Sequence, residues 1–251
     1  MKFSSEDQLV SKIGAKFGRK IAEVHKLKYK RSTIISKKEV SLGWGIADVV
    51  MSFVDNRRLS NKKSPILSLG TMTILDSMPI GKIVNLEYLS SISGIQKSVL
   101  KNKHLKMLAI NNYVEFLEEN TFVKVNELIT GNEVIAIEAK LSDWKRALYQ
   151  ACRYKLFADL SYVVLDSTHT ISAIKNLDSF RKFGVGLACI DTRGNIDIIL
   201  EAPKQEPTSN RLKTIANEIL LESVLVTNLD RSSNQSTHQD AYSQTYQQAV
   251  L

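Results

Sequence analysis

The segment VIAIEAK (Val134–Lys140) carries the most chemically informative residues of the sequence. It is an apolar run that ends in Glu138 and Lys140, and the alternation of side chains along a strand places both on one face. Such a pair marks either an exposed strand end or a functional site. A second acidic residue, Asp48, lies inside the apolar run 45–51, where an unpaired charge costs several kcal/mol. We therefore expect Asp48 to pair with a Lys or Arg or to bind a cation.

Two inward carboxylates and a lysine on neighbouring strands suit the hydrolysis of a phosphodiester. Asp48 and Glu138 would hold Mg²⁺, a hard cation that takes oxygen ligands, with Mn²⁺ as a substitute. The metal would neutralise phosphoryl oxygens and lower the pKa of an attacking water. Lys140 would orient that water or stabilise the developing charge. In the helix expected next, Gln150 and Tyr154 share a face, so Gln150 is expected to reach this site or a substrate phosphate.

The same helix carries three basic residues that we expect along a nucleic-acid backbone: Lys145, Arg146 and Arg153. Taken singly, such residues are more often solvated charges than ligands.

Gly45-Ile46-Ala47-Asp48, Glu138-Ala139-Lys140 and Gln150-x-x-x-Tyr154 together resemble the PD-(D/E)xK nuclease superfamily. The resemblance implies an α/β fold, with a restriction-endonuclease-like mixed sheet flanked by helices. It implies Asp48 and Glu138 as metal ligands, Lys140 as the catalytic lysine, and Gln150 and Tyr154 as the helix motif of the exonuclease-like branch. Glu6 is a candidate accessory acid, and helix capping accounts for it equally well. The sequence departs from the family pattern at Ala47, where the motif has Pro, and in the roughly 90 residues between Asp48 and Glu138.

The elements expected to position these residues follow from hydrophobic periodicity. Before the gap we expect a helix at 4–27, with Ser5 and Gln8 as a capping box, and strands at 32–35 and 46–53. After it we expect strands at 134–138, 161–165, 185–190 and 196–200, and helices at 142–158, 171–183 and 209–227. The nuclease-like core would comprise residues 1–55 and 130–204, followed by a C-terminal helix in 205–228 and a disordered polar tail at 229–251.

The intervening segment has the element order of a winged helix-turn-helix domain at 64–128. A polar, basic linker at 55–64 precedes helices at 66–77, 86–91 and 96–110, with a Ser93-Gly94 turn before the third. A hairpin of 113–117 and 121–125 follows. As a DNA reader, the third helix would lead with Gln96, Lys97, Ser98, Lys101 and Asn102, and would offer Lys103, His104 and Lys106 to phosphates. As a protein-interaction module, the same domain would need no basic face. His104 is expected at the surface.

The charge distribution is compatible with a polyanionic partner, and a solvated helix face accounts for it equally well. The chain of 251 residues has 34 Lys+Arg against 26 Asp+Glu, and the first 40 residues hold 11 and 4 of these. No run approaches the roughly 18 apolar residues of a membrane span, and the N-terminus lacks the apolar segment of a signal peptide. Cys152 and Cys189 lie in apolar runs and are expected to be buried thiols. We therefore expect a cytoplasmic protein without a membrane partner.

The leading hypothesis is a Mg²⁺-dependent DNA endonuclease, with the winged helix delivering DNA. The main alternative is a non-catalytic DNA-binding regulator or complex subunit that retains a nuclease fold, and an RNA nuclease is a third. A homodimer and a larger nuclease complex are both compatible with the sequence.

Overall fold

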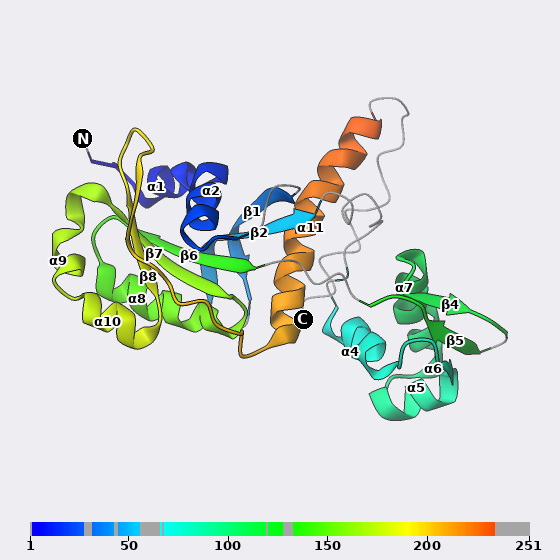
Figure 1. The fold of residues 1–251 in the computed structure, drawn as a ribbon. Helices are drawn as coiled ribbons and strands as arrows, with labels where there is room; N and C mark the ends of the chain where they lie inside the picture. The colour runs from blue at the N-terminus through cyan, green and yellow to red at the C-terminus, as the bar shows by residue number, and fades with distance from the viewer. Residues whose placement is uncertain are drawn as a thin grey trace. The chain divides into compact units, whose positions relative to one another are not determined.

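The computed structural model describes residues 2–27, 32–42, 45–55, 66, 68–118, 120–127 and 133–233 (Figure 1). The chain divides into two compact units. The core unit comprises Met1–Ser60 and Thr130–Leu220, and the inserted unit comprises Asn61–Ile129 and Leu221–Leu251.

The core unit is built on one mixed six-stranded sheet in the order β1-β2-β6-β7-β8-β9. Its strands are β1 (Ser32–Ser41), β2 (Ile46–Asp55), β6 (Val134–Lys140), β7 (Leu160–Asp166), β8 (Gly186–Ile190) and β9 (Ile196–Leu200). The pairs β6–β7 and β7–β8 are parallel and the other three pairs are antiparallel. The α/β class and the mixed sheet flanked by helices are as the sequence predicts.

Helices cover both faces of this sheet (Figure 1). One face is covered by α1 (Glu6–Lys12) and α2 (Ala15–Val24). Their side chains Leu9, Phe17 and Ile21 are buried in a hydrophobic cluster with the side chains of β2, β6 and β7 that point to this face. The opposite face is covered by α8 (Trp144–Arg153) and α10 (Leu177–Phe183). The Ser161 hydroxyl of β7 donates a 2.6 Å hydrogen bond to the Ala151 carbonyl of α8.

The single helix expected at 4–27 is wrong, because the chain forms α1 and α2 with a break at Ile13–Gly14. Ser5 accepts a hydrogen bond from the Gln8 N–H and begins α1, as the capping prediction expects. Gly14 adopts an extended conformation (φ −154°, ψ −150°) as the N-cap of α2. A glycine costs helix stability relative to alanine, so the interruption falls at this position.

Two other predicted helices are also divided. The segment expected as one helix at 171–183 forms α9 (Ile171–Ile174) and α10, and the side-chain amide of Asn176, between the two helices, donates to the Ser172 carbonyl. The helix expected at 142–158 begins only at Trp144, because the Asp143 carboxylate caps the Arg146 N–H. It ends at Arg153 and continues as the 3₁₀ turn η2 (Tyr154–Leu156).

The ends of the chain also differ from the expectation. The last helix, α11 (Asn210–Ser233), begins within one residue of the start predicted at 209 but extends beyond 228. Residues 229–233 are therefore helical rather than part of a disordered tail, and 234–251 lie outside the described residues. Most of the expected linker at 55–64 lies outside them as well. The helix expected to begin at residue 66 begins at Leu69 as α4 (Leu69–Ser77), because the Ser68 hydroxyl caps it by accepting a hydrogen bond from the Thr71 N–H.

The inserted unit contains helices and a small antiparallel sheet in the order β3-β5-β4. Its helices are α4 (Leu69–Ser77), α5 (Leu86–Ser93), α6 (Lys97–Val99), the π-helical η1 (Leu100–Leu105) and α7 (Lys106–Ile110), and its strands are β3 (Ile83–Asn85), β4 (Val114–Phe116) and β5 (Thr121–Lys124). The last three helical segments are continuous and together match the helix predicted at 96–110. Gly94 ends α5 at φ +69°, which a glycine adopts without steric cost.

The insertion joins the core at one end of two adjacent strands. Ser52 of β2 pairs with Val134 of β6, so the exit after Asp55 and the return before Val134 lie side by side. Asp48 is near the beginning of β2 and Lys140 ends β6, so both lie at the other end of this strand pair.

Two further expectations concern burial and membranes. Cys152 and Cys189 are free and only partly buried, so the prediction of buried thiols is wrong. Within the described residues, no helix has the length and apolar character needed to cross a bilayer.

Candidate active site

Asp48 and Glu138 meet where two paired strands diverge. The antiparallel ladder between β2 and β6 ends at Val49 and Ile137, although β2 starts at Ile46 and β6 continues to Lys140. The next opposed residues are Asp48 and Glu138, which share the face covered by α8. Because the ladder stops here, the Ala139 N–H donates instead to the Asp48 carboxylate, with an N–O distance of 2.7 Å.

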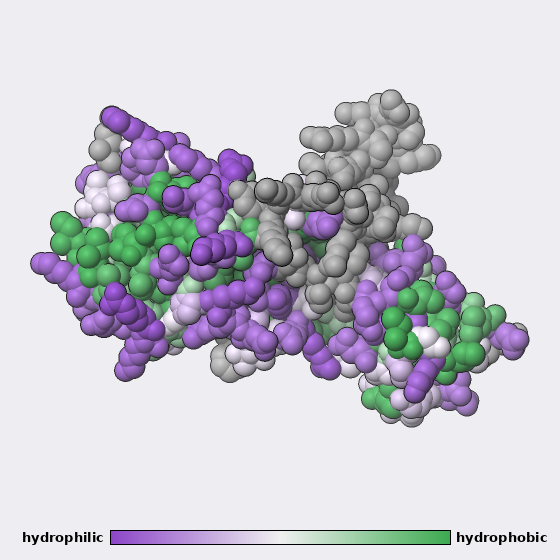
Figure 2. All heavy atoms as spheres, in the orientation of Figure 1, coloured by the Kyte–Doolittle hydropathy of each residue, from purple (hydrophilic) through white to green (hydrophobic). Residues whose placement is uncertain are grey.

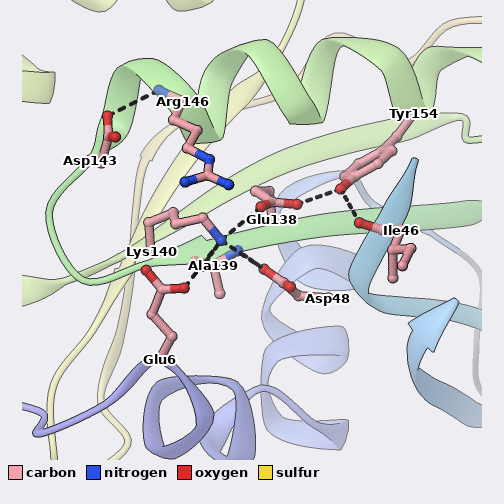
Figure 3. A network of polar contacts seen from close by, with 9 residues as sticks. All are labelled: Glu6, Ile46, Asp48, Glu138, Ala139, Lys140, Asp143, Arg146 and Tyr154. Atoms are coloured by element: carbon pink, nitrogen blue, oxygen red, sulfur yellow. Dashed lines mark hydrogen bonds and ion pairs between the residues drawn. The ribbon is translucent and has the colours of Figure 1, made fainter. Parts of the chain in front are cut away.

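The ammonium group of Lys140 joins three carboxylates (Figure 3). Its Nζ lies 2.9 Å from Glu138 Oε1 and 3.8 Å from Asp48 Oδ2. It also lies 3.2 Å from Oε2 of Glu6, which reaches the site from the first turn of α1. Three acids against one base leave an excess of negative charge at this point, which a further cation would neutralise.

The Tyr154 hydroxyl connects the two diverging strands. It contacts Glu138 Oε2 in a short hydrogen bond, and it lies 2.6 Å from the Ile46 carbonyl oxygen. The hydroxyl has one proton, and both the ionised carboxylate and the carbonyl are acceptors. Tyr154 therefore holds Glu138 either by sharing this proton or by accepting one from the protonated acid.

Burial alters the protonation equilibria of the group. Glu138 is fully buried, and desolvation raises the pKa of its carboxyl despite the hydrogen bond from Tyr154, while the nearby charge of Asp48 adds to the rise. Desolvation also raises the pKa of Asp48, and the bond from Ala139 opposes it. For Lys140, burial alone would lower the pKa of the amine, but the surrounding carboxylates outweigh it and the pKa is raised. Burial and the charge of Glu138 raise the pKa of Tyr154 well above its usual range.

These residues fit a divalent oxygen-ligated cation such as Mg²⁺. Glu138 Oε1 is buried and lies 2.9 Å from the Lys140 ammonium, so this oxygen already faces a positive charge. No set of three His, Cys, Asp or Glu side chains in the described part of the chain is arranged to hold a metal ion. Mg²⁺ in enzymes is commonly held by one or two carboxylates together with waters and substrate phosphates. Asp48 and Glu138 supply such a pair.

The helix residues predicted for the site differ in whether they contact its carboxylates. Tyr154 touches Glu138, as described above. Gln150 is partly buried, and its Oε1 is enclosed without a hydrogen-bond donor among the described residues, so no contact with the carboxylates is formed. Lys145, Arg146 and Arg153 are all exposed. Lys145 lies over the Trp144 ring and Arg153 over the Tyr149 ring, whereas Arg146 points toward Lys140 and Glu138 (Figure 3).

On the inserted unit, the residues predicted to read DNA are exposed: Gln96, Lys97, Ser98, Lys101, Asn102 and Lys103. Lys97 forms an ion pair of 2.9 Å with Glu87, and Lys101 donates to the Asn120 side chain. The prediction that His104 is a surface residue is wrong. It is 6% exposed and its Nδ1 lies 2.7 Å from the Thr71 hydroxyl, so it is not available to a phosphate.

Sequence reasoning missed the backbone groups of the site. The Ala139 N–H and the Ile46 carbonyl bind its side chains, and no residue type signals such a role. It also missed the direction of Arg146, since helical spacing alone does not separate this residue from its basic neighbours. The burial of His104 had a signal, because Leu100, His104 and Leu108 recur four residues apart and are all buried.

Comparisons with protein-family models, with curated proteins and with solved structures found no match to this chain.

Proposed function

We propose that this chain is a Mg²⁺-dependent DNA endonuclease with a PD-(D/E)xK-type site in a restriction-endonuclease-like core. One observation carries the proposal. Asp48 lies 91 positions before Ala139, the residue between Glu138 and Lys140, yet all three side chains occupy one site at the diverging ends of adjacent strands. Two acidic oxygen ligands beside an ammonium group are the residue types that phosphodiester hydrolysis with a metal requires.

Each residue then has a stated task. Asp48 and Glu138 hold the cation, which supplies Lewis-acid stabilisation of phosphoryl oxygens and a more acidic bound water. Lys140 orients the attacking water or stabilises the charge that develops on the phosphate. Tyr154 fixes the Glu138 carboxylate through its hydroxyl, and the Ala139 N–H fixes that of Asp48. Glu6 sets the position of the Lys140 ammonium.

The inserted unit is proposed to engage the DNA as a winged helix-turn-helix domain. Its three successive helices and β4–β5 hairpin agree with that fold, and the start of its third helix is exposed and rich in lysine. The same unit also exposes hydrophobic residues, including Ile83, Val99, Ile110 and Phe116. Figure 2 shows hydrophobic surface among the charged residues of this unit. These exposed hydrophobic residues favour the alternative that the unit binds a protein.

The test is a cleavage assay on supercoiled plasmid with Mg²⁺ or Mn²⁺, and with EDTA as the metal-free control. Wild type should cleave, while Glu138→Ala and Lys140→Ala should lose cleavage and retain DNA binding. Glu206→Ala removes an exposed acid of the core unit and should cleave normally. Metal-independent binding without cleavage by the wild type would favour a non-catalytic subunit. Cleavage of single-stranded RNA in a parallel reaction, with plasmid left intact, would favour an RNA nuclease.

A further inference from the structure

Arg146 occupies a fixed position beside the candidate site. It lies in the first turn of α8, where its backbone N–H donates to the capping carboxylate of Asp143 over 3.1 Å. This cap sets where the helix begins and therefore the direction in which the side chain leaves it. Figure 3 shows the guanidinium extending from α8 toward Lys140 and Glu138.

The guanidinium has no partner within the described part of the chain. The ion pairs of Glu6, Asp48 and Glu138 are all made with Lys140. Arg146 forms neither an ion pair nor a side-chain hydrogen bond with any described residue, although an acidic cluster lies on the side to which it points. Its N–H donors therefore remain free, beside a second cation.

We propose that Arg146 binds the non-bridging oxygens of the scissile phosphate, and this inference rests on the proposed nuclease function. The carboxylates pair with Lys140, whereas no described carboxylate pairs with Arg146, so the charge of Arg146 is available to the phosphate that a cation on Asp48 and Glu138 would bring to the site. A guanidinium offers a planar fork of donors that matches a phosphate, whereas an ammonium acts as a point charge. Lys140 is thus held in ion pairs with the three carboxylates, while Arg146 is the group that binds the substrate phosphate.

This role differs from that of a remote backbone contact. A contact to the reacting phosphate strengthens as charge develops there, so its loss slows the cleavage step itself. A contact to a distant phosphate changes the affinity for DNA and its salt dependence. Arg153 lies at the other end of α8, over the Tyr149 ring, and serves as the comparison for the second kind of contact.

The experiment measures plasmid cleavage under single-turnover conditions at saturating protein with Mg²⁺, and DNA affinity separately with Ca²⁺. Arg146→Ala should slow the saturated rate by about 10- to 100-fold and change the dissociation constant far less. Arg146→Lys, which keeps the charge and loses the fork, should fall between Arg146→Ala and wild type. Arg153→Ala should weaken affinity more than it slows the saturated rate. Arg181→Ala, which removes an exposed arginine paired with Asp178 on α10, should change neither quantity.

The outcomes separate this inference from the proposed function. A saturated rate for Arg146→Ala equal to that of an active wild type would overturn the assignment of Arg146 and leave the nuclease standing. A wild type that cleaves neither plasmid nor RNA with either metal would overturn both. Circular dichroism of each variant establishes that the α/β core remains folded.

Discussion

The Asp48 carboxylate accepts a hydrogen bond from the backbone N–H of Ala139 over 2.7 Å, although 91 positions separate the two residues. This bond lies where the ladder between β2 and β6 ends. A side-chain carboxylate accepts there from the backbone N–H, in place of a backbone carbonyl of the neighbouring strand. Asp48 thus satisfies an N–H that the divergence would otherwise leave without an acceptor. Asp48 therefore stabilises the end of the sheet and also contributes a carboxylate to the candidate site.

Substitution at Asp48 should separate these two roles. Asn keeps an oxygen that can accept from Ala139 and loses the charge, so Asp48→Asn should unfold near the wild-type urea midpoint. Asp48→Ala leaves the N–H unpaired and should lower the free energy of unfolding by about 1–3 kcal/mol. Both should reduce metal-dependent cleavage by at least about 100-fold. Equal stability of the Asn and Ala variants would contradict the structural role.

The Tyr154 hydroxyl is predicted to be a structural support of Glu138. Tyr154→Phe removes a buried hydroxyl that contacts both the acid and the Ile46 carbonyl, so unfolding should become easier by about 1–3 kcal/mol. Cleavage should slow because Glu138 loses its anchor. Urea unfolding and single-turnover cleavage measure the two effects. Tyr149→Phe, at a 70% exposed tyrosine of the preceding helix α8, is the matched control and should change neither.

Metal binding should be visible without substrate. A ligand at a hundred times its dissociation constant stabilises the folded state by about 2.7 kcal/mol, so saturating Mg²⁺ should raise the Tm by several degrees. Na⁺ at equal ionic strength should not produce this shift. Asp48→Asn and Glu138→Gln remove the two proposed ligands, and their Tm should not respond to Mg²⁺. A full response in both variants would place the cation elsewhere.

The stability of the metal-free protein should depend on pH through Glu138. Burial raises the pKa of this carboxyl in the folded chain above its value in the unfolded chain. Between the two values the folded state binds more protons, so the free energy of unfolding falls as pH rises through this interval. Below the unfolded value the contribution of the protonated acid is fully present.

Glu138→Gln has no titrating group at this position and provides the reference. The difference in unfolding free energy, wild type minus variant, should decline in EDTA as the pH rises above the pKa that this glutamate has in the unfolded chain. Urea unfolding at a series of pH values measures it. A difference that is constant or that rises with pH would contradict the assignment.

The inserted unit should contribute to DNA affinity through the lysines of its third helix. Lys103 is exposed and forms no ion pair or hydrogen bond with a described residue. If it contacts a phosphate, Lys103→Ala should lower affinity and reduce the magnitude of the slope of log K against log salt by about one. Lys82→Ala removes an exposed lysine outside that helix and is the control. An unchanged slope for Lys103→Ala would favour the protein-binding alternative.

Hydrophobic patterning was sufficient to predict the strands of the sheet and the approximate positions of the helices that cover it. The apolar run ending at Glu138 forms β6, and the strands predicted at 185–190 and 196–200 form β8 and β9. Patterning did not locate the break at Gly14, because the apolar stripe continues through it and only the backbone changes direction.

The meeting of Asp48 with Glu138 could be inferred only from the resemblance. No periodicity relates two strands separated by an entire folded unit, so their pairing depends on tertiary structure. The sequence also placed Glu6 in the first turn of a helix without separating its two roles. In the structure Ser5 provides the cap, and the Glu6 carboxylate contacts Lys140.

The pairing of β2 with β6 across the inserted unit has a consequence for the rate of folding. The central antiparallel ladder forms only after a long loop has closed, and non-local pairing of this kind slows folding. Contacts within the insertion are close in sequence, so its helices and hairpin should acquire structure first. Because Asp48 and Ala139 bond at the end of this late ladder, the site should be among the last parts of the core to form during refolding.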